Sequence, residues 1–244
     1  MNNTKNTNTI AALILALGIF AASVVGAYTF YSVRSFDNTI SSTGSAKTLV
    51  TSDTVKWNLN ISRKAYEGTL KTEYANMAYD TQLVKDFLKK NGVSDEVITV
   101  SQISANEIYK YNSNGDTGPR EYNLNQTIKV ESSDVQAIDA LSKNVDELIN
   151  RGVFINGNYL EFYVSSLPEL RVSLLSDAIK DAKARAEQIA ESNGQSVGSL
   201  QSASSGVTQV LAPNSIDISD YGQYDTQSIE KEVMITVRAT FFLK

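Results

Sequence analysis

The stretch VKWNLNI, residues 55–61, decides the fold class of this chain. Its apolar residues alternate with polar ones, which is the period-two pattern of a β-strand with one buried face. Apolar residues then recur at helical spacing over 66–88, and Gly92 follows as a C-terminal cap behind two lysines. The pattern predicts a strand followed by a long amphipathic helix. The apolar residues of the strand are Val55, Trp57, Leu59 and Ile61.

A β-hairpin is predicted after this helix. Strand patterns occupy 98–109 and 122–130, and the segment 112–119 between them is rich in Asn, Ser, Gly and Asp, which form turns. The turn contains Asp116-Thr117-Gly118, the tripeptide with which aspartic proteases activate water through paired carboxylates. Because turn residues rather than apolar strands surround it, we interpret the tripeptide as a solvated hairpin turn.

A second helix and a fourth strand complete the pattern. Ser133 and Gln136 form a capping box before an apolar stripe that ends at Gly152, and alternation at 160–164 marks the strand. The order over 53–166 is therefore β-α-β-β-α-β, which folds as an antiparallel sheet with both helices on one face. The sequence predicts a ferredoxin-like plait in this region.

The remaining segments predict a second small α+β layer. A capping box at Ser166 begins a long helix whose alanine stripe permits close packing, and strands follow at 200–211 and 233–243. Residues 34–52 supply a linker and the first strand of this layer, and residues 167–244 supply its helix and closing strands. The predicted fold class is α+β.

The N-terminal residues 1–33 form a membrane or export segment. Residues 10–31 carry no charge and approach the roughly 20 apolar residues that span a bilayer. We expect an uncleaved inner-membrane anchor, with the following region in the periplasm or outside the cell. The alternative is a signal peptide cleaved after Val25-Gly26-Ala27, which leaves a soluble periplasmic protein. Both alternatives place the bulk of the chain in the cell envelope.

Composition narrows the functional classes. The chain has no cysteine and no histidine, so it lacks thiolate nucleophiles, zinc–sulfur sites and the side chain that most often transfers protons near neutral pH. Its formal net charge of −5 argues against nucleic acid as a partner, because phosphates require a basic surface. We expect no enzymatic activity, no catalytic residues, no cofactor and no bound metal.

The acidic loop 212–228 is the candidate partner-binding site. Its aspartates offer oxygens to calcium, but their spacing matches no calcium-binding loop. Its tyrosines belong to a residue type that is favoured at protein interfaces. We therefore interpret the segment as a loop that contacts a partner. The residues singled out are Asp217, Asp220, Tyr221 and Tyr224.

A second motif lies directly after this loop. Ser228-Ile229-Glu230-Lys231 matches the Ser-x-x-Lys pattern, in which a lysine activates a serine nucleophile. That arrangement operates at the start of a helix, whereas Lys231 precedes an alternating strand. We therefore place Lys231 on a surface strand edge.

The chain resembles the SIMPL-domain family, which includes periplasmic immunogenic proteins. The resemblance rests on Gly44-Ser45-Ala46 leading into residues 51–55, on the alanine-rich helix 177–190 with the glycines that follow it at 193–198, and on the closing strand 233–242. It implies an envelope protein with a two-part α+β fold, and ring-like oligomers for some members. It also implies a link to oxidative stress in some bacteria and to signalling in animals, with no established reaction.

The leading hypothesis is a non-enzymatic, self-associating envelope protein that forms a homo-oligomer and acts as a scaffold or binding module. One alternative is a monomeric membrane-anchored module that captures a partner through the 212–228 loop. Another is a hydrolase that uses carboxylates alone, which requires a pair of Asp or Glu residues converging in a pocket with a raised pKa.

Overall fold

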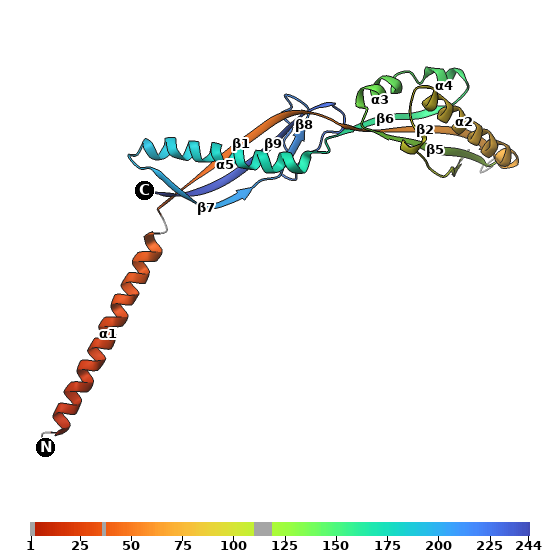
Figure 1. Cartoon of the computed structure of the whole chain (residues 1–244). Helices are drawn as coiled ribbons and strands as arrows, with labels where there is room; N and C mark the ends of the chain where they lie inside the picture. The colour runs from red at the N-terminus through yellow and green to blue at the C-terminus, as the bar shows by residue number, and fades with distance from the viewer. Residues whose placement is uncertain (1–2, 36–37, 110–118) are drawn as a thin grey trace, which may run out of the picture. The chain divides into compact units, whose positions relative to one another are not determined.

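The computed structural model describes residues 3–35, 38–109 and 119–244, and the chain divides into two compact units (Figure 1). Unit 1 comprises Met1–Ala46, Ser173–Val207 and Ile235–Lys244. Unit 2 comprises Lys47–Val172 and Thr208–Met234, and therefore contains the whole of the predicted plait. The Asp116-Thr117-Gly118 tripeptide lies outside the described residues.

The N-terminal segment is a helix, α1 (Asn3–Ser35). Its stretch Ala12–Ser32 is long and apolar enough to cross a membrane, and none of it is buried within the protein. A signal sequence near an N-terminus also contains a long apolar segment, so the length and hydropathy of α1 fit both an anchor and a signal sequence. The prediction of an apolar export or membrane segment is confirmed, and the choice between an anchor and a cleaved signal stays a prediction.

Unit 2 is built around an antiparallel sheet. The strand order is β3-β5-β2-β6, and the short strand β4 also pairs with β5. If β2, β3, β5 and β6 are numbered 1 to 4 along the chain, their order in the sheet, read from β6, is 4-1-3-2. Each neighbouring pair of these strands is antiparallel. The predicted ferredoxin-like plait is confirmed. The strands are β2 (Thr54–Tyr66), β3 (Ile98–Val100), β4 (Ser104–Ile108), β5 (Glu121–Ser132) and β6 (Ile155–Tyr163).

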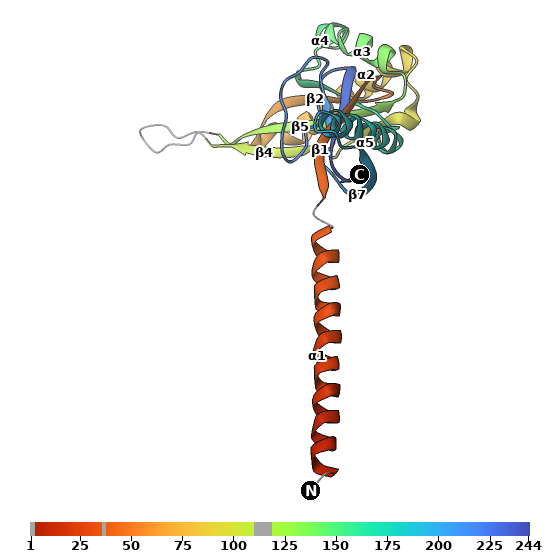
Figure 2. The ribbon, with the colours of Figure 1, turned by 90° about the vertical axis from the view of Figure 1, so that its left-hand side faces the viewer.

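The helices of unit 2 cover one face of this sheet (Figures 1 and 2). The strand and helix residues that point toward each other form an apolar core around the fully buried Trp57. The Trp57 Nε1–H donates to Asn158 Oδ1 at 2.6 Å, so the one polar group of this ring has a partner. The helices are α2 (Leu70–Lys90), α3 (Val135–Ser142) and α4 (Asp146–Asn150), with 3₁₀ turns at η1 (Glu67–Thr69) and η2 (Asp95–Val97).

The second helix of the plait differs from its prediction in two respects. It is broken into α3 and α4, and the Asn144 side chain donates to the Ala140 carbonyl oxygen at 2.9 Å at the break. Asparagine competes for backbone partners in this way and weakens a helix interior. The cap is Asp134, whose Oδ1 accepts from the Ala137 N–H at 3.1 Å, so the predicted capping box at Ser133 is wrong.

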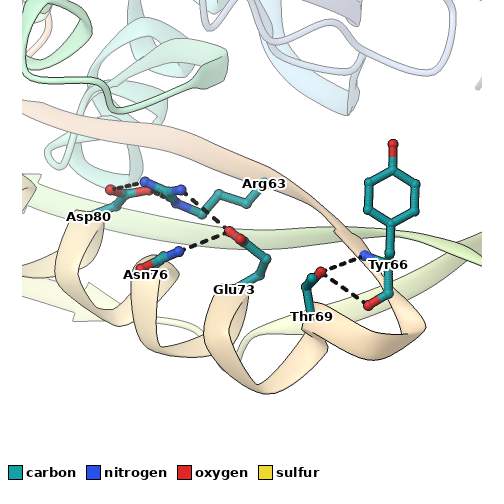
Figure 3. A network of polar contacts seen from close by, with 6 residues as sticks. All are labelled: Arg63, Tyr66, Thr69, Glu73, Asn76 and Asp80. Carbon is teal, nitrogen blue, oxygen red and sulfur yellow. Dashed lines mark hydrogen bonds and ion pairs between the residues drawn. The ribbon is translucent and has the colours of Figure 1, made fainter.

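Helix α2 is tied to strand β2 by one arginine. Figure 3 shows the Arg63 guanidinium facing the buried Asp80, with Nε–Oδ2 and Nη2–Oδ1 distances of 2.5 and 2.9 Å. This two-pronged geometry is the stronger form of an arginine–carboxylate pair. Glu73 accepts from Arg63 at 3.5 Å and from Asn76 at 3.2 Å, which extends the network along the helix.

Unit 1 is organised around a second sheet with the strand order β1-β9-β7. The strand predicted at 200–211 is two strands, β7 and β8, both of which pair with β9. Non-strand residues that include Gly206 separate them, and the Gly206 N–H donates to the Thr236 carbonyl oxygen at 2.9 Å. The division between the units falls within β1, α5 and β9 and between β7 and β8, so β8 and the start of β9 belong to unit 2 although they pair within this sheet. The strands are β1 (Thr39–Thr51), β7 (Val197–Ser205), β8 (Gln209–Leu211) and β9 (Glu230–Leu243).

The long helix α5 (Leu167–Glu191) packs on this sheet through small residues. A Cβ at Gly44 of β1 would overlap the carbonyl oxygen of Ala178 and the amide nitrogen of Ala182. The helix backbone therefore rests directly against the strand, which only glycine permits at this position. The predicted alanine stripe is confirmed as the buried face of α5. Its members are Ala178, Ala182, Ala186 and Ala190.

Candidate functional site

The candidate partner-binding loop, 212–228, connects β8 to β9, and a buried lysine holds its C-terminal end. Lys231 is fully buried, and its Nζ donates to the carbonyl oxygens of Asp225 and Ser228 at 2.5 and 2.7 Å. The placement of Lys231 on a surface strand edge is wrong. The alternation of buried and more exposed residues in β9 begins at Lys231 rather than at Val233, so both side chains lie on the buried face.

The charges around this lysine favour an ion pair at neutral pH. Burial lowers the pKa of Lys231, and the Asp225 carboxylate, 3.8 Å away, opposes that shift. Burial raises the pKa of Asp225, but N–H donation from Gln227 at 2.9 Å and from Ser228 at 3.2 Å, together with the lysine charge, makes the net shift downward. Lys231 thus donates its N–H groups to the loop backbone, and its role is structural.

Tyr224 also holds the loop rather than extending from it. Its hydroxyl oxygen accepts from the Val164 N–H at 3.0 Å, and its ring lies 5.7 Å from the Tyr163 ring and 5.7 Å from Lys231 Nζ. Backbone bonds of 2.8 Å join Val210 to both Gln223 and Asp225. The C-terminal end of the loop is therefore fixed to β8, to the end of β6 and to β9.

The middle of the loop projects apolar side chains into solvent. Gln209 Nε2 donates to the Ser219 carbonyl oxygen at 2.6 Å and pins the loop from beneath. On either side of this point, Ile216 is 91% exposed and Tyr221 is 96% exposed, and Ile218 is exposed as well. Of the residues selected from the sequence, Asp217, Asp220 and Tyr221 are exposed, and Tyr224 is half-buried.

Sequence reasoning missed the two isoleucines of this loop. It concentrated on charged and aromatic residues, whereas the apolar pair Ile216 and Ile218 is what makes the exposed surface unusual. The signal in the sequence was the alternation of these two isoleucines with polar residues in a segment without a strand partner. The segment lies between Asn214 and Gly222, and both of these residues have a positive φ. Three exposed apolar side chains thus lie within one short segment, and clustered apolar exposure marks interaction sites more than single exposed residues do.

A second anchored turn lies at the start of β2. Asp53 accepts from the Ser165 N–H at 2.9 Å and from the Ser165 hydroxyl at 2.6 Å. Burial raises the pKa of Asp53, but these two hydrogen bonds make the net shift downward. The bonds join the start of β2 to the segment after β6. Asp53 is thus a structural acceptor in the turn between β1 and β2.

Among the residues that the structure describes, every carboxylate with a shifted pKa is shifted downward. They are Asp53, Asp181 and Asp225, and each accepts backbone N–H donors. A hydrolase acid needs the opposite shift, because a carboxyl group that donates a proton near neutral pH has a raised pKa. In the described ranges, no group of three or more Asp and Glu residues has the geometry of a metal site.

Comparison with known proteins identifies the family of the chain. A search of curated proteins finds no match to the chain. The family model SIMPL, described as a protein of unknown function (DUF541), matches residues 40–241. The match covers the helices α2 to α5 and the strands of both sheets, except for the first residue of β1 and the last two residues of β9. The chain belongs to the SIMPL family.

Proposed function

We propose that this chain is a non-enzymatic protein of the cell envelope that self-associates through strand β7 and acts as a scaffold. Helix α1 serves as its uncleaved membrane anchor, and the two units lie outside the cytoplasm. Membership of the SIMPL family and the length and apolar character of α1 support this location. The downward pKa shifts and structural roles of Asp53, Asp181 and Asp225 support a function without catalysis.

The observation that carries self-association is the exposure of β7. This strand ends the β1-β9-β7 order, and its residues from Ser199 to Ser205 are exposed on both faces of the sheet. Leu200 is 44% exposed. No charged residue occurs between Glu191 and Asp217. Natural edge strands are often protected from pairing with another chain by lysine, proline or β-bulges. Strand β7 has no lysine or proline, and its register with β9 shifts between Val197 and Ser202 but is regular from Ser202 to Ser205.

The other edge of the unit 1 sheet carries a protecting charge. The Ser45 N–H of β1 donates to Asp181 Oδ2 at 2.8 Å, and Arg185 Nε donates to the same oxygen at 2.9 Å. The Ser45 bond is the main cause that lowers the pKa of Asp181, which keeps the carboxylate charged at neutral pH. A carboxylate at this position occupies a strand N–H and repels a second strand. Association at β7 is therefore favoured over association at β1.

Light scattering on residues 38–244 tests this proposal. Removing α1 exposes no core, because its apolar stretch is unburied. We expect the wild-type region to have a defined oligomeric mass and Ser204→Lys, in β7, to shift it toward the monomer. Gln188→Lys places the same charge on the exposed face of α5 and should leave the mass unchanged. A wild-type monomer, or an oligomer that Ser204→Lys does not alter, would rule out β7 as the interface.

A second candidate function is capture of a protein partner by the 212–228 loop. Its support is the pinned geometry: Lys231 and Tyr224 fix one end, while Ile216 and Tyr221 are almost fully exposed. A surface that is already ordered loses less conformational entropy on binding, and exposed tyrosines are frequent binding hot spots.

Substitution at the tip separates this candidate from the first. The double variant Ile216→Ser and Tyr221→Ser removes the apolar surface without touching the anchor. We expect it to abolish recovery of specific envelope proteins in a pull-down with the full chain, while the oligomeric mass stays constant. Recovery equal to that of the wild type would contradict loop capture.

A further inference from the structure

The sheet of unit 2 has one face covered by helices and one polar face. Residues that are paired between neighbouring strands point to the same side of a sheet. Ser62 pairs with Asn125, Lys64 pairs with Asn123, and Asn60 pairs with Thr127, all opposite to the face that carries Trp57. Strand β4 adds Asn106, paired with Asn123. The uncovered face is therefore rich in side-chain amides.

Three of these amides form a cluster with unused hydrogen-bonding groups. Asn125 Oδ1 accepts from Asn123 Nδ2 at 3.3 Å and from Asn156 Nδ2 at 3.2 Å. An amide has two N–H donors and an oxygen with two lone pairs. Within the described part of the chain, the Oδ1 atoms of Asn123 and Asn156 and one N–H of each have no partner. The cluster thus presents alternating donors and acceptors.

The cluster borders a hollow of about 480 Å³, a size that suits a small ligand. Ser62, Asn123 and Asn156 line its polar side, and Phe154 and Ile108 line its apolar side. Phe154 is 65% exposed, so its ring is accessible to a ligand in the hollow. A flat apolar surface next to paired amide groups favours a ligand that has an apolar face and a polar rim.

The hollow also contains one free cation. Among the residues that the structure describes, Arg63 and Lys64 line it and no carboxylate does. The Arg63 guanidinium is held by Asp80 and Glu73, as Figure 3 shows. Lys64 is exposed, and no carboxylate within the described ranges forms an ion pair with it. An unpaired cation beside neutral amides complements a ligand that carries a carboxylate.

From this geometry we infer that the hollow binds an acidic saccharide, for which a hexuronic acid is the simplest form. Neighbouring sugar hydroxyls both donate and accept hydrogen bonds, as do the free amide groups of Asn123 and Asn156. The C–H face of a pyranose ring packs on Phe154. The carboxylate of the sugar pairs with Lys64. All the lining residues belong to unit 2, and the inference does not depend on self-association.

Titration of the full chain in nanodiscs tests the inference, with D-glucuronate, D-glucose, acetate and trialanine as probes. Saturation-transfer NMR detects contact, and calorimetry gives the dissociation constants. We expect glucuronate to bind most tightly, with a dissociation constant of about 1 mM, and glucose to bind about tenfold more weakly. Acetate and trialanine should show no saturable binding.

Two variants assign the contacts. Asn156→Ala should weaken glucuronate and glucose about tenfold each, because it removes hydrogen bonds that both sugars make. Lys64→Gln should reduce glucuronate affinity to that of glucose and leave glucose unchanged. The control Asn193→Ala, in the exposed turn after α5, should bind like the wild type, and circular dichroism verifies the fold of each variant.

The inference is overturned by three results. The first is the absence of saturable glucuronate binding to the folded chain. The second is acetate or trialanine binding as tightly as glucuronate, which would indicate a cation site or a peptide site. The third is glucuronate binding that neither Asn156→Ala nor Lys64→Gln weakens, which would place the saccharide elsewhere on the chain.

Discussion

Lys231 shows how a buried charge organises the surface loop before it. Its Nζ lies between the carbonyl oxygens of Asp225 and Ser228, so Lys231→Met would leave both acceptors without this donor. Because an unsatisfied buried polar group costs about 1–3 kcal/mol, we expect the free energy of unfolding to fall by that amount. Urea denaturation followed by circular dichroism measures the change.

A matched surface variant isolates the effect of burial. Lys180→Met removes an exposed lysine that pairs with Asp177 on α5. Such surface pairs contribute about 0–1 kcal/mol, so this variant should denature close to the wild type. Equal denaturation midpoints for Lys231→Met and Lys180→Met would show that the Lys231 contacts do not stabilise the fold.

Asp53 predicts a pH dependence. Its pKa is lowered in the folded chain, so its hydrogen bonds to Ser165 stabilise the fold above the unfolded-state pKa of about 3.9 and lose this effect as the pH falls through the folded-state pKa. Asp53→Asn should be less stable than the wild type at pH 7, and the difference should narrow below about pH 4. Urea midpoints at several pH values test this, and a constant difference would contradict it.

The contacts of Lys231 and Tyr224 in the candidate site were not predictable from the sequence. Alternation in β9 was readable from Val233 onward, but the burial of Lys231 depends on loop carbonyls that only the folded chain brings together. Tyr224 was selected for its residue type, and its position was not predictable because its partner, Val164, is far away in the sequence. Tyr221 was selected for the same reason and is exposed.

At the scale of elements, the packing of α5 on β1 yields a sharp test. Gly44→Ala places a methyl group where the α5 backbone lies, so the helix must move away from the strand. Overpacking of this kind costs about 1–3 kcal/mol, and we expect a loss of that size in the free energy of unfolding. Thermal or urea denaturation measures it.

Gly68→Ala provides the control for this test. A Cβ at Gly68 meets no atom within 4 Å, and the residue lies in the short turn η1. Alanine there should be neutral or stabilise the fold by up to about 1 kcal/mol, because it restricts the unfolded chain. Equal free energies of unfolding for the Gly44→Ala and Gly68→Ala variants would show that α5 does not pack directly against Gly44 of β1.

Element types were predictable because their periods were clear, and element boundaries were not. The plait order followed from strand alternation in β2 and β5 and from the helical period in α2. The breaks were missed for local reasons: Asn144 interrupts the second plait helix through a backbone contact, and Gly206 lies between β7 and β8. Single residues of this kind hardly change an apolar period, although they decide where hydrogen bonding stops.

At the scale of the whole molecule, the two units differ in which part of the sheet is left uncovered by helices. Unit 2 uses its helices to cover one face of its sheet and leaves the amide-rich face open. In unit 1, helix α5 covers part of the sheet, while β7 is exposed on both faces. The proposed saccharide site and the proposed self-association surface are therefore carried by different units, and a variant in one can be used as a control for the other.

The state of α1 determines how these surfaces are presented. If α1 is an anchor, intact mass spectrometry of the protein from membranes should give the whole 26.7 kDa chain, and alkaline carbonate should not extract it. Its uncharged span, Ala12–Ser32, is long enough to cross the bilayer core. A mass that lacks residues 1–27, with the protein in the soluble fraction, would instead establish cleavage after Ala27. Self-association through β7 would then have to occur without the concentrating effect of a shared membrane surface.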